Sequence, residues 1–412
     1  MSSKKTVRAI VAVATLAVVT AGCSTKAEDS GGGSGGGSSD VATDVGIEGT
    51  TITLGALTDL TGVFAALGND ITNGNSLFWE ENKVCDTYDV EIDVQDTSYN
   101  VQTAVQLYSG MKDNVLGMQQ TIGSSINTAL GADYQADQVI NFPSAWGKTL
   151  TEIPGTGVLG ATYDIEIANG YDYLLQEGLL AEGDTVGHIY FEGEYGENAL
   201  AGSEAAAEAY GLELAKVQIK ATDSDMTAQV TQLAAAGADV IVLTVAPPQL
   251  ASVAAVVQAQ GLDVPILGSN PVFAPGLLEG PTADILKKNL YIASPISAFD
   301  EHPEILEAYQ AAFPEITPSL GVVFGYGMAE TMKQVLDSAC EEGDLTREGV
   351  LAAFEGLSDV DTGGLIVPLR GFESGKSPSL ESYILKPDDV PGGASLLQDA
   401  FTGDLASTLD GE

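Results

Sequence analysis

The feature that most constrains the fold is an alternation, repeated twice along the chain, between short β-branched runs and segments of helical periodicity. Runs rich in Val, Ile and Thr have the length and composition of buried strands. These strand candidates are Thr51–Leu57, Val90–Val94, Val115–Ile122, Val139–Phe142, Thr185–Phe191, Leu212–Ile219, Asp239–Val245 and Val264–Leu267. Apolar residues recur at three- and four-residue spacing between them, as in the helix candidates Ala104–Asp113, Glu197–Tyr210, Ala228–Ala236 and Leu250–Gln260.

Strands that alternate with helices of this length predict parallel sheets with helices on both faces. The pattern occurs twice with similar spacing, and residues 155–168 separate the two occurrences. We therefore predict an α/β protein made of two doubly wound, Rossmann-like lobes. In such sheets ligands bind beyond the carboxyl ends of the strands, so two facing lobes predict a cleft between them.

The charge of the chain excludes one class of partner. Acidic residues number 58 against 16 basic residues, which makes the formal charge −42. Nucleic-acid binding requires clustered Lys and Arg, and attraction to anionic lipid headgroups requires the same. With 44% hydrophobic residues the chain nevertheless has enough apolar surface to bury a core. We expect an acidic folded protein that binds no nucleic acid.

The N-terminus has the pattern of an export signal. Basic residues in the first eight positions precede the uncharged run Ala9–Ala21, which is too short to span a bilayer and is typical of a secretory signal peptide. The segment Thr20–Cys23 resembles the lipobox of bacterial lipoproteins, in which the cysteine is lipidated. Residues 30–39 are a flexible Gly/Ser stretch. We expect a lipoprotein signal peptide at 1–22, a tether at 23–47 and lipidation of Cys23; an ordinary signal peptide with an incidental cysteine is the alternative.

The chain offers little for catalysis. Of its two histidines, His188 lies within a strand candidate and is expected to be structural, and His302 lies in a loop and is expected to be a solvated surface group. The run Gly155–Gly160 matches GxGxxG, but Pro154 precedes it where a nucleotide site needs a strand. We expect a connection between lobes there, no cofactor, no metal site and no enzymatic activity.

Two loops that follow strand candidates have the residues of a small-molecule site. The first contains Ser124 and Ser125 where a strand ends and a helix begins, so hydroxyls and free helix amides can bind a carboxylate. The second contains Ser144, Ala145 and Trp146, which combine a hydroxyl with an aromatic wall. The alternatives are a simple helix N-cap for the first pair of serines and core packing for Trp146.

Two cysteines remain for the body of the protein. Cys85 and Cys340 form an even pair in an exported chain, which is compatible with a disulfide. Two separate buried thiols are equally compatible with their positions.

The order of several short motifs resembles a known family. The motifs are ITLGALTDLTGVFAALGNDITNG at 52–74, QDTSYNVQTAV at 95–105, IGSSINTAL at 122–130, FPSAW at 142–146, FEGEYGENALAG at 191–202 and the run from 234 to 270. Together they resemble the substrate-binding lipoproteins of branched-chain amino acid ABC importers, which are type I periplasmic binding proteins.

This resemblance implies how the chain divides. Three crossovers, near Ala161–Ile165, Ala293–Ile296 and Thr362–Pro368, would join the lobes and allow hinge closure. The first lobe is expected to contain 48–163 and 295–365, the second 164–294 and 366–390, and a C-terminal tail 391–412. The resemblance also brings Cys85 close to Cys340 and thereby favours a disulfide between them.

The resemblance further implies roles for residues at the cleft. Ser124 and Ser144 would hold a ligand carboxylate, and Tyr195 would cover the ligand from the second lobe. Leu67 and Ala246 stand where amino-acid binders place aromatic side chains. Asn270 stands where those binders place a carboxylate against the ligand's ammonium group. Because Asn is neutral and a buried ammonium needs an anionic partner, we expect a ligand with an apolar or aromatic body and one polar or anionic end.

The function implied is that of a monomeric extracytoplasmic receptor, held at the outer face of the bacterial cell membrane by its lipid anchor alone. It would capture a small amino-acid-like, amide or carboxylate ligand and deliver it to the permease of an ABC importer. The alternative is a ligand sensor of the same fold that is coupled to a signalling partner.

Overall fold

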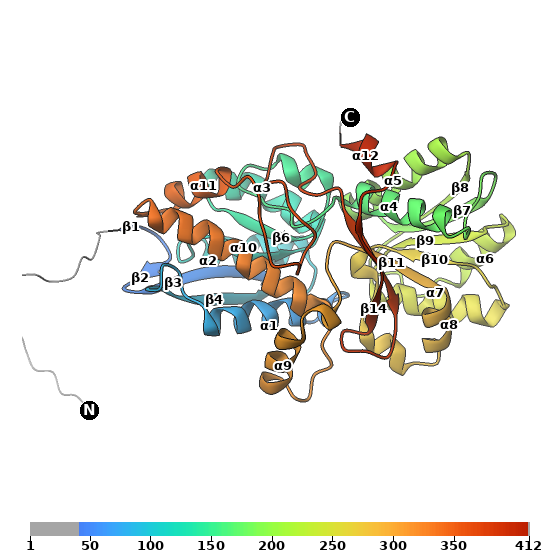
Figure 1. The fold of residues 1–412 in the computed structure, drawn as a ribbon, viewed down its shortest axis with the longest axis horizontal. Helices are drawn as coiled ribbons and strands as arrows, with labels where there is room; N and C mark the ends of the chain where they lie inside the picture. The colour runs from blue at the N-terminus through green and yellow to red at the C-terminus, as the bar shows by residue number, and fades with distance from the viewer. Residues whose placement is uncertain (1–40, 411–412) are drawn as a thin grey trace, which may run out of the picture. The chain divides into compact units, whose positions relative to one another are not determined.

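A computed structural model describes residues 41–410 of the chain. The expected signal peptide, Cys23 and most of the expected tether lie outside these residues. Within them the chain forms two sheets with helices on both faces, as Figure 1 shows, so the predicted α/β class with two doubly wound lobes is confirmed.

Lobe 1 is built on a five-stranded sheet near the N-terminal end of the described chain. Its parallel strands have the order β4-β3-β5-β6, and the short β2 pairs antiparallel with the start of β3. The strands are β2 (Ile47–Glu48), β3 (Thr51–Thr58), β4 (Asp89–Asp96), β5 (Met118–Ile122) and β6 (Asn141–Ser144). The helices are α1 (Ala65–Glu81), α2 (Val101–Met111), α3 (Ser124–Asp137), η1 (Lys148–Glu152), η4 (Phe299–Glu301), α9 (Pro303–Ala312), α10 (Gly321–Glu341) and α11 (Arg347–Glu355).

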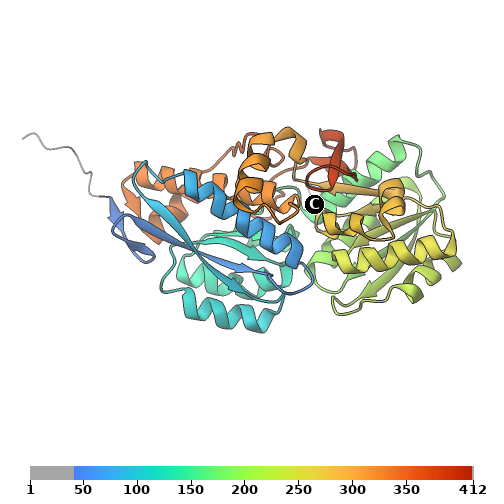
Figure 2. The same cartoon turned by 90° about the horizontal axis from the view of Figure 1, so that it is seen from below.

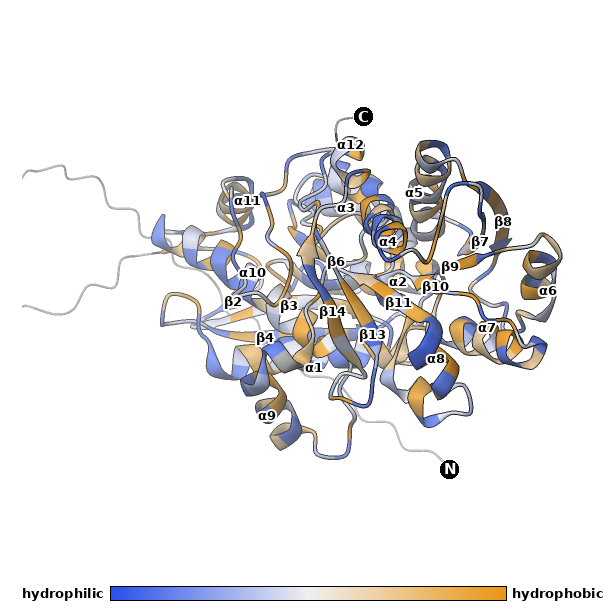
Figure 3. Ribbon diagram, turned by 45° about the vertical axis from the view of Figure 1, so that its right-hand side comes forward, coloured by the Kyte–Doolittle hydropathy of each residue, from blue (hydrophilic) through white to orange (hydrophobic). Residues whose placement is uncertain are grey.

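Lobe 2 is built on a seven-stranded sheet of order β14-β13-β11-β10-β9-β7-β8, parallel except for β13 and β14. The strands are β7 (Thr185–Phe191), β8 (Glu213–Ile219), β9 (Val240–Thr244), β10 (Ile266–Gly268), β11 (Leu290–Ser294), β13 (Ser382–Pro387) and β14 (Ala394–Phe401). The helices are α4 (Tyr163–Gln176), α5 (Glu194–Tyr210), α6 (Thr227–Ala235), α7 (Pro247–Gln260), η2 (Asn270–Val272), η3 (Pro275–Glu279), α8 (Ala283–Asn289) and α12 (Ala406–Leu409). Figure 3 shows β9, β10 and β11 as largely apolar, which agrees with their burial in the middle of the sheet.

Both ends of the described chain depart from expectation. Residues 42–43, expected in the tether, form β1 (Ala42–Thr43), which pairs with β12 (Asp344–Leu345). Residues 394–401, expected in a C-terminal tail, form β14 and pair antiparallel with β13. Both are edge strands with one side in solvent, and an edge strand does not need the continuous apolar run by which buried strands are recognised.

The chain passes between the lobes after β6, after β11 and before β13. The last two passages lie side by side, because Ile296 and Ile366 form an antiparallel bridge and the Val367 amide donates to the Pro295 carbonyl at 2.9 Å. The boundary expected at 366 is too early. Phe372 still packs in lobe 1, where its ring stacks on Phe354 with centroids 4.8 Å apart.

A disulfide joins Cys85, which follows α1, to Cys340 near the end of α10. Helices α1 and α10 pack along one another in lobe 1 (Figure 2). Glycine makes this approach possible, since a Cβ added at Gly325 would lie 2.3 Å from the Ile71 carbonyl oxygen. No helix in residues 41–410 is both long enough and apolar enough to cross a membrane.

Replacing Gly325 by alanine is expected to lower the free energy of unfolding by about 1–3 kcal/mol, because the added methyl group must push two backbones apart. Gly110→Ala is the matched control, since Gly110 also lies in a helix and nothing stands within 4 Å of its added Cβ. That control is expected to be neutral or slightly stabilising. Urea denaturation of the two variants measures both; equal stability would contradict the close contact.

Candidate functional site

A cavity lies between the two lobes and is reached from the carboxyl ends of their strands. The empty space in and at the mouth of the cavity is about 750 Å³, a value that includes open solvent. Its wall includes aromatic and aliphatic side chains, a few hydroxyls and one amide, and every lining residue is neutral. The aromatic residues are Phe64, Tyr99, Trp146, Tyr163, Tyr195, Phe273 and Phe324. The cavity therefore suits a predominantly apolar ligand.

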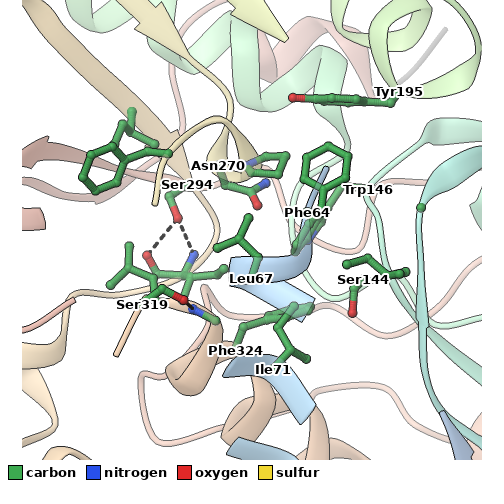
Figure 4. Close-up of a pocket in the computed structure, with 18 of the residues that line it drawn as sticks. Phe64, Leu67, Ile71, Ser144, Trp146, Tyr195, Asn270, Ser294, Ser319 and Phe324 are labelled. Carbon is green, nitrogen blue, oxygen red and sulfur yellow. Dashed lines mark hydrogen bonds between the residues drawn. The ribbon is translucent and has the colours of Figure 1, made fainter. Parts of the chain in front are cut away.

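Helix α1 supplies one apolar side of the cavity. Phe64 caps the helix, and Leu67 and Ile71 follow at helical spacing, so the three side chains share one face (Figure 4). The Phe64 ring meets Tyr99 edge-on with centroids 4.9 Å apart. Leu67, which was predicted at the ligand, thus lies in the wall.

The N-terminus of α3 supplies a polar group to the cavity. Gly123 lies between β5 and α3 with φ +96°, a conformation that favours glycine, and an added Cβ would lie 2.7 Å from the Tyr99 ring. The first helical hydrogen bond runs from the Asn127 amide to the Gly123 carbonyl at 3.0 Å. The amides of residues 124–126 precede it and have no partner within the helix. Ser124 is 1% exposed, and its Oγ has no partner within the protein.

A second hydroxyl lies next to this helix start. Ser144 ends β6, the strand beside β5, and its carbonyl accepts the Gly123 amide at 3.3 Å. Ser144 is 6% exposed, and its Oγ likewise has no partner. Two unpartnered hydroxyls and a helix N-terminus thus meet at one end of the cavity.

The hydroxyls at the opposite side are already in use. Ser294 Oγ donates to the Ile296 carbonyl and accepts the Ile296 amide, both at 3.0 Å. Ser319 Oγ accepts the Gly321 amide at 3.1 Å. Figure 4 shows Ser294 and Ser319 across the cavity from Ser144. Of the four serine hydroxyls that line the cavity, those of Ser124 and Ser144 are therefore the two without a partner in the protein.

Two aromatic residues present their rings to the cavity while their polar atoms bind the protein. Tyr195 shares a hydrogen bond with Ser269 Oγ at 2.6 Å and donates to the Val245 carbonyl at 3.1 Å. Trp146 Nε1 donates to the Leu159 carbonyl at 2.7 Å. Trp146 is 3% exposed and packs against Tyr163 and Phe324, so it is both core and cavity wall.

Asn270 also lines the cavity, and it binds a carboxylate that no sequence motif indicates. Its backbone amide donates to Glu166 Oε1 and its Nδ2 donates to Oε2, both at 2.8 Å. Glu166 lies in the first turn of α4 and is fully buried. Burial raises the pKa of Glu166 from 4.5 to about 8, and the two hydrogen bonds from Asn270 oppose that rise.

This pKa shift makes stability depend on pH. The unfolded chain releases the Glu166 proton near pH 4.5 and the folded protein only near pH 8, so the folded state binds the proton more tightly. The free energy of unfolding is therefore expected to fall by a few kcal/mol as pH rises through this window. Urea denaturation at about pH 5 and about pH 8.5 measures the fall. A Glu166→Gln variant that loses as much stability as the parent protein would contradict this assignment.

Three predicted ligand residues lie outside the cavity wall. Ser125 is exposed on α3, Ala145 is fully buried behind the wall, and Ala246 is fully buried at the start of α7. Ser125 and Ala145 are sequence neighbours of residues that line the cavity, and Ala246 follows the buried Val245. A step of one residue in a loop or at a helix start points the next side chain in another direction, away from the cavity. The serine pair Ser124 and Ser125 is thus separated by the structure.

The two histidines differ in outcome. His188 is buried and both ring nitrogens have hydroxyl partners, Thr244 at 3.0 Å and Ser203 at 2.9 Å, as a structural residue requires. His302 was expected on the surface, and this was wrong. It is 7% exposed, and its Nε2 lies 2.9 Å from Ser297 Oγ beside the crossovers. Within residues 41–410 no group of three or more His, Cys, Asp or Glu residues is arranged to hold a metal ion.

Known proteins share this architecture. The sequence profile of a family described as periplasmic binding protein matches residues 51–389. A solved fatty acid ABC transporter substrate-binding protein from Thermomonospora curvata is 38% identical, with a TM-score of 0.87 over 90% of this chain and 97% of that chain. A branched chain amino acid ABC transporter protein from Thermus thermophilus, solved with bound valine, is 17% identical, with a TM-score of 0.75 over 87% of this chain and 98% of that chain. The search of curated proteins found no match.

The profile match covers most of the chain, and the Thermomonospora curvata structure is 38% identical over 90% of it. The more distant structure shares the fold. Two lobes, each built on a sheet of mainly parallel strands, are the fold that these proteins have in common. The chain therefore belongs to the periplasmic binding protein family, as a type I solute-binding protein of the kind that serves ABC transporters.

Proposed function

We propose that the protein binds a monocarboxylate with an apolar body, of the fatty-acid class, and delivers it to an ABC importer. The observation that carries this proposal is the pair of buried, unpartnered hydroxyls of Ser124 and Ser144 at one end of a neutral, largely apolar cavity. A buried hydroxyl without a partner is costly, so a ligand that supplies acceptor oxygens there gains affinity.

A carboxylate fits this end of the cavity. Its two oxygens accept several hydrogen bonds, which the two hydroxyls and the amides at the start of α3 can donate. The positive end of the helix dipole favours the negative charge, and the first turn of α3 contains no acidic residue. The aromatic and aliphatic remainder of the wall suits a hydrocarbon chain or ring.

A zwitterionic amino acid fits less well. No charged side chain lines the cavity, so a ligand ammonium group would be buried without an anionic partner. The similar protein from Thermomonospora curvata is a fatty acid ABC transporter substrate-binding protein, which supports the same choice.

Titration calorimetry with decanoate, decanol and leucine tests the proposal. We expect decanoate to bind most tightly, decanol more weakly because it cannot supply a charged acceptor, and leucine least. Tryptophan fluorescence gives a second readout, because Trp146 lines the cavity and Trp79 does not. Tight leucine binding with no response to decanoate would overturn the proposal.

Delivery to a permease places the protein outside the cytoplasm, and we propose that Cys23 anchors it there through lipid. A Cys23→Ser variant is expected to leave the membrane fraction and appear in the soluble exported fraction. Equal membrane retention of both forms would contradict the anchor.

A further inference from the structure

One ionisable group next to the cavity has no role in carboxylate binding. Glu166 is fully buried, and none of the ion pairs among the described residues includes it. Buried carboxylates in proteins are normally paired with a cation, because leaving water is costly. Here both oxygens are bound by one residue, Asn270, through its amide and its side chain.

Asn270 lies at the surface of the cavity, and Glu166 lies behind it. Asn270 lines the cavity, as Figure 4 shows, whereas Glu166 does not. Tyr163, three residues before Glu166 on α4, also lines the cavity, so that face of the helix points toward it. The Asn270 side chain therefore separates a carboxylate from the space in which the ligand lies.

We propose that Asn270 is a specificity-determining residue that covers Glu166, and that this covering makes the cavity reject ligands that carry an ammonium group. The inference deepens the proposed function, on which it rests for the assumption that the cavity takes up amphiphiles. An uncovered carboxylate at this wall would pair with a ligand cation and would repel a carboxylate ligand.

The hydrogen bonds explain why an amide suits this position. One N–H of Asn270 Nδ2 donates to Glu166, which leaves its second N–H and its carbonyl oxygen, and neither of these offers the cavity a charge. An aspartate here would place two carboxylates in contact, which raises their pKa values and strains the wall. Asparagine satisfies Glu166 and keeps the wall neutral.

The test compares decylamine with decanol, which share a chain and differ in the ammonium group. The readout is the ratio of their affinities in each protein, measured by calorimetry at about pH 9, where folded Glu166 has lost its proton and the amine, with a pKa of about 10.4, is still charged. In the parent protein we expect decanol to bind at least as tightly as decylamine. In Asn270→Ala, and in Asn270→Ser, the ratio is expected to shift at least tenfold toward decylamine.

Glu166→Gln provides the matched control in both backgrounds. Combined with Asn270→Ala it is expected to return the ratio to the parent value, because the carboxylate is gone. Alone it is expected to leave the parent ratio unchanged, because Asn270 already hides that group. Circular dichroism and thermal melting show which variants are folded.

The inference is overturned if the ratio does not shift in a folded Asn270 variant, or if the shift survives Glu166→Gln. A changed ratio in Glu166→Gln alone would also overturn it, and this arm needs no substitution at Asn270. Failure of the parent protein to bind decanoate would instead contradict the proposed function. The ratio of amine to alcohol is measured independently of that result.

Discussion

The double substitution Ser124→Ala with Ser144→Ala is expected to weaken decanoate binding at least a hundredfold. A hydrogen bond to a charged group contributes about 1.5–3 kcal/mol, so two lost bonds amount to about 3–6 kcal/mol. A factor of ten corresponds to about 1.4 kcal/mol. Titration calorimetry measures the loss directly, and decanol is expected to lose much less because it carries no charge.

The same double substitution has a second, opposite consequence. Both Oγ atoms are buried and unpartnered in the protein without ligand, so their removal is expected to leave that form as stable as before or more stable. Affinity would fall while the melting temperature holds or rises. A merely structural role for these serines predicts that stability falls instead.

Thr156 offers a matched control for this experiment. Its Oγ1 is also buried and unpartnered, but the residue does not line the cavity. Thr156→Val is therefore expected to leave decanoate affinity unchanged. If the serine variants bind decanoate like the parent protein, the carboxylate lies elsewhere.

Replacing both Cys85 and Cys340 by alanine is expected to lower the free energy of unfolding by about 4–5 kcal/mol. The bond closes a loop with a sequence separation of 255 residues, so it removes much conformational freedom from the unfolded chain. That loop contains every strand of lobe 2 except β13 and β14. Urea denaturation under non-reducing conditions, with the parent protein as reference, measures the loss.

Loss of the disulfide is expected to change the stability of the protein and to leave its affinity for decanoate unchanged. Neither cysteine lines the cavity, so the folded alanine variant is expected to bind decanoate with the parent affinity at low urea. Unchanged stability, or two free thiols in the parent protein under non-reducing mass spectrometry, would contradict the prediction. A Cys85→Ala single variant, which leaves Cys340 unpaired, is expected to lose about as much stability.

Local patterns predicted the strands well. The strand candidate Thr185–Phe191 matches β7 residue for residue, and Asp239–Val245 contains β9. Both are buried central strands, and a continuous apolar run in the sequence directly indicates such burial. The edge strand β14 was missed because it is partly exposed, so its sequence has no continuous apolar run.

The candidate site was predicted in part. Leu67, Ser124, Ser144, Trp146, Tyr195 and Asn270 line the cavity, whereas Ser125, Ala145 and Ala246 do not. Loop position indicates which residues come near a cleft, but the direction of each side chain depends on backbone angles such as the φ of +96° at Gly123. His302 illustrates the same limit, since the crossover before β13 brings the Gly364 carbonyl to 3.3 Å from its Nε2.

Local sequence patterns and the folded structure thus supply different information about this protein. Residue order alone was sufficient for the α/β class, the two lobes and the strand-end loops, because these depend on local periodicity and on which surfaces must be buried. The pairing of Glu166 with Asn270, 104 residues apart, and the unpartnered hydroxyls of Ser124 and Ser144 emerged only in the folded structure. Whether a polar group is satisfied depends on atoms that folding brings from distant parts of the chain, and no local pattern contains that information.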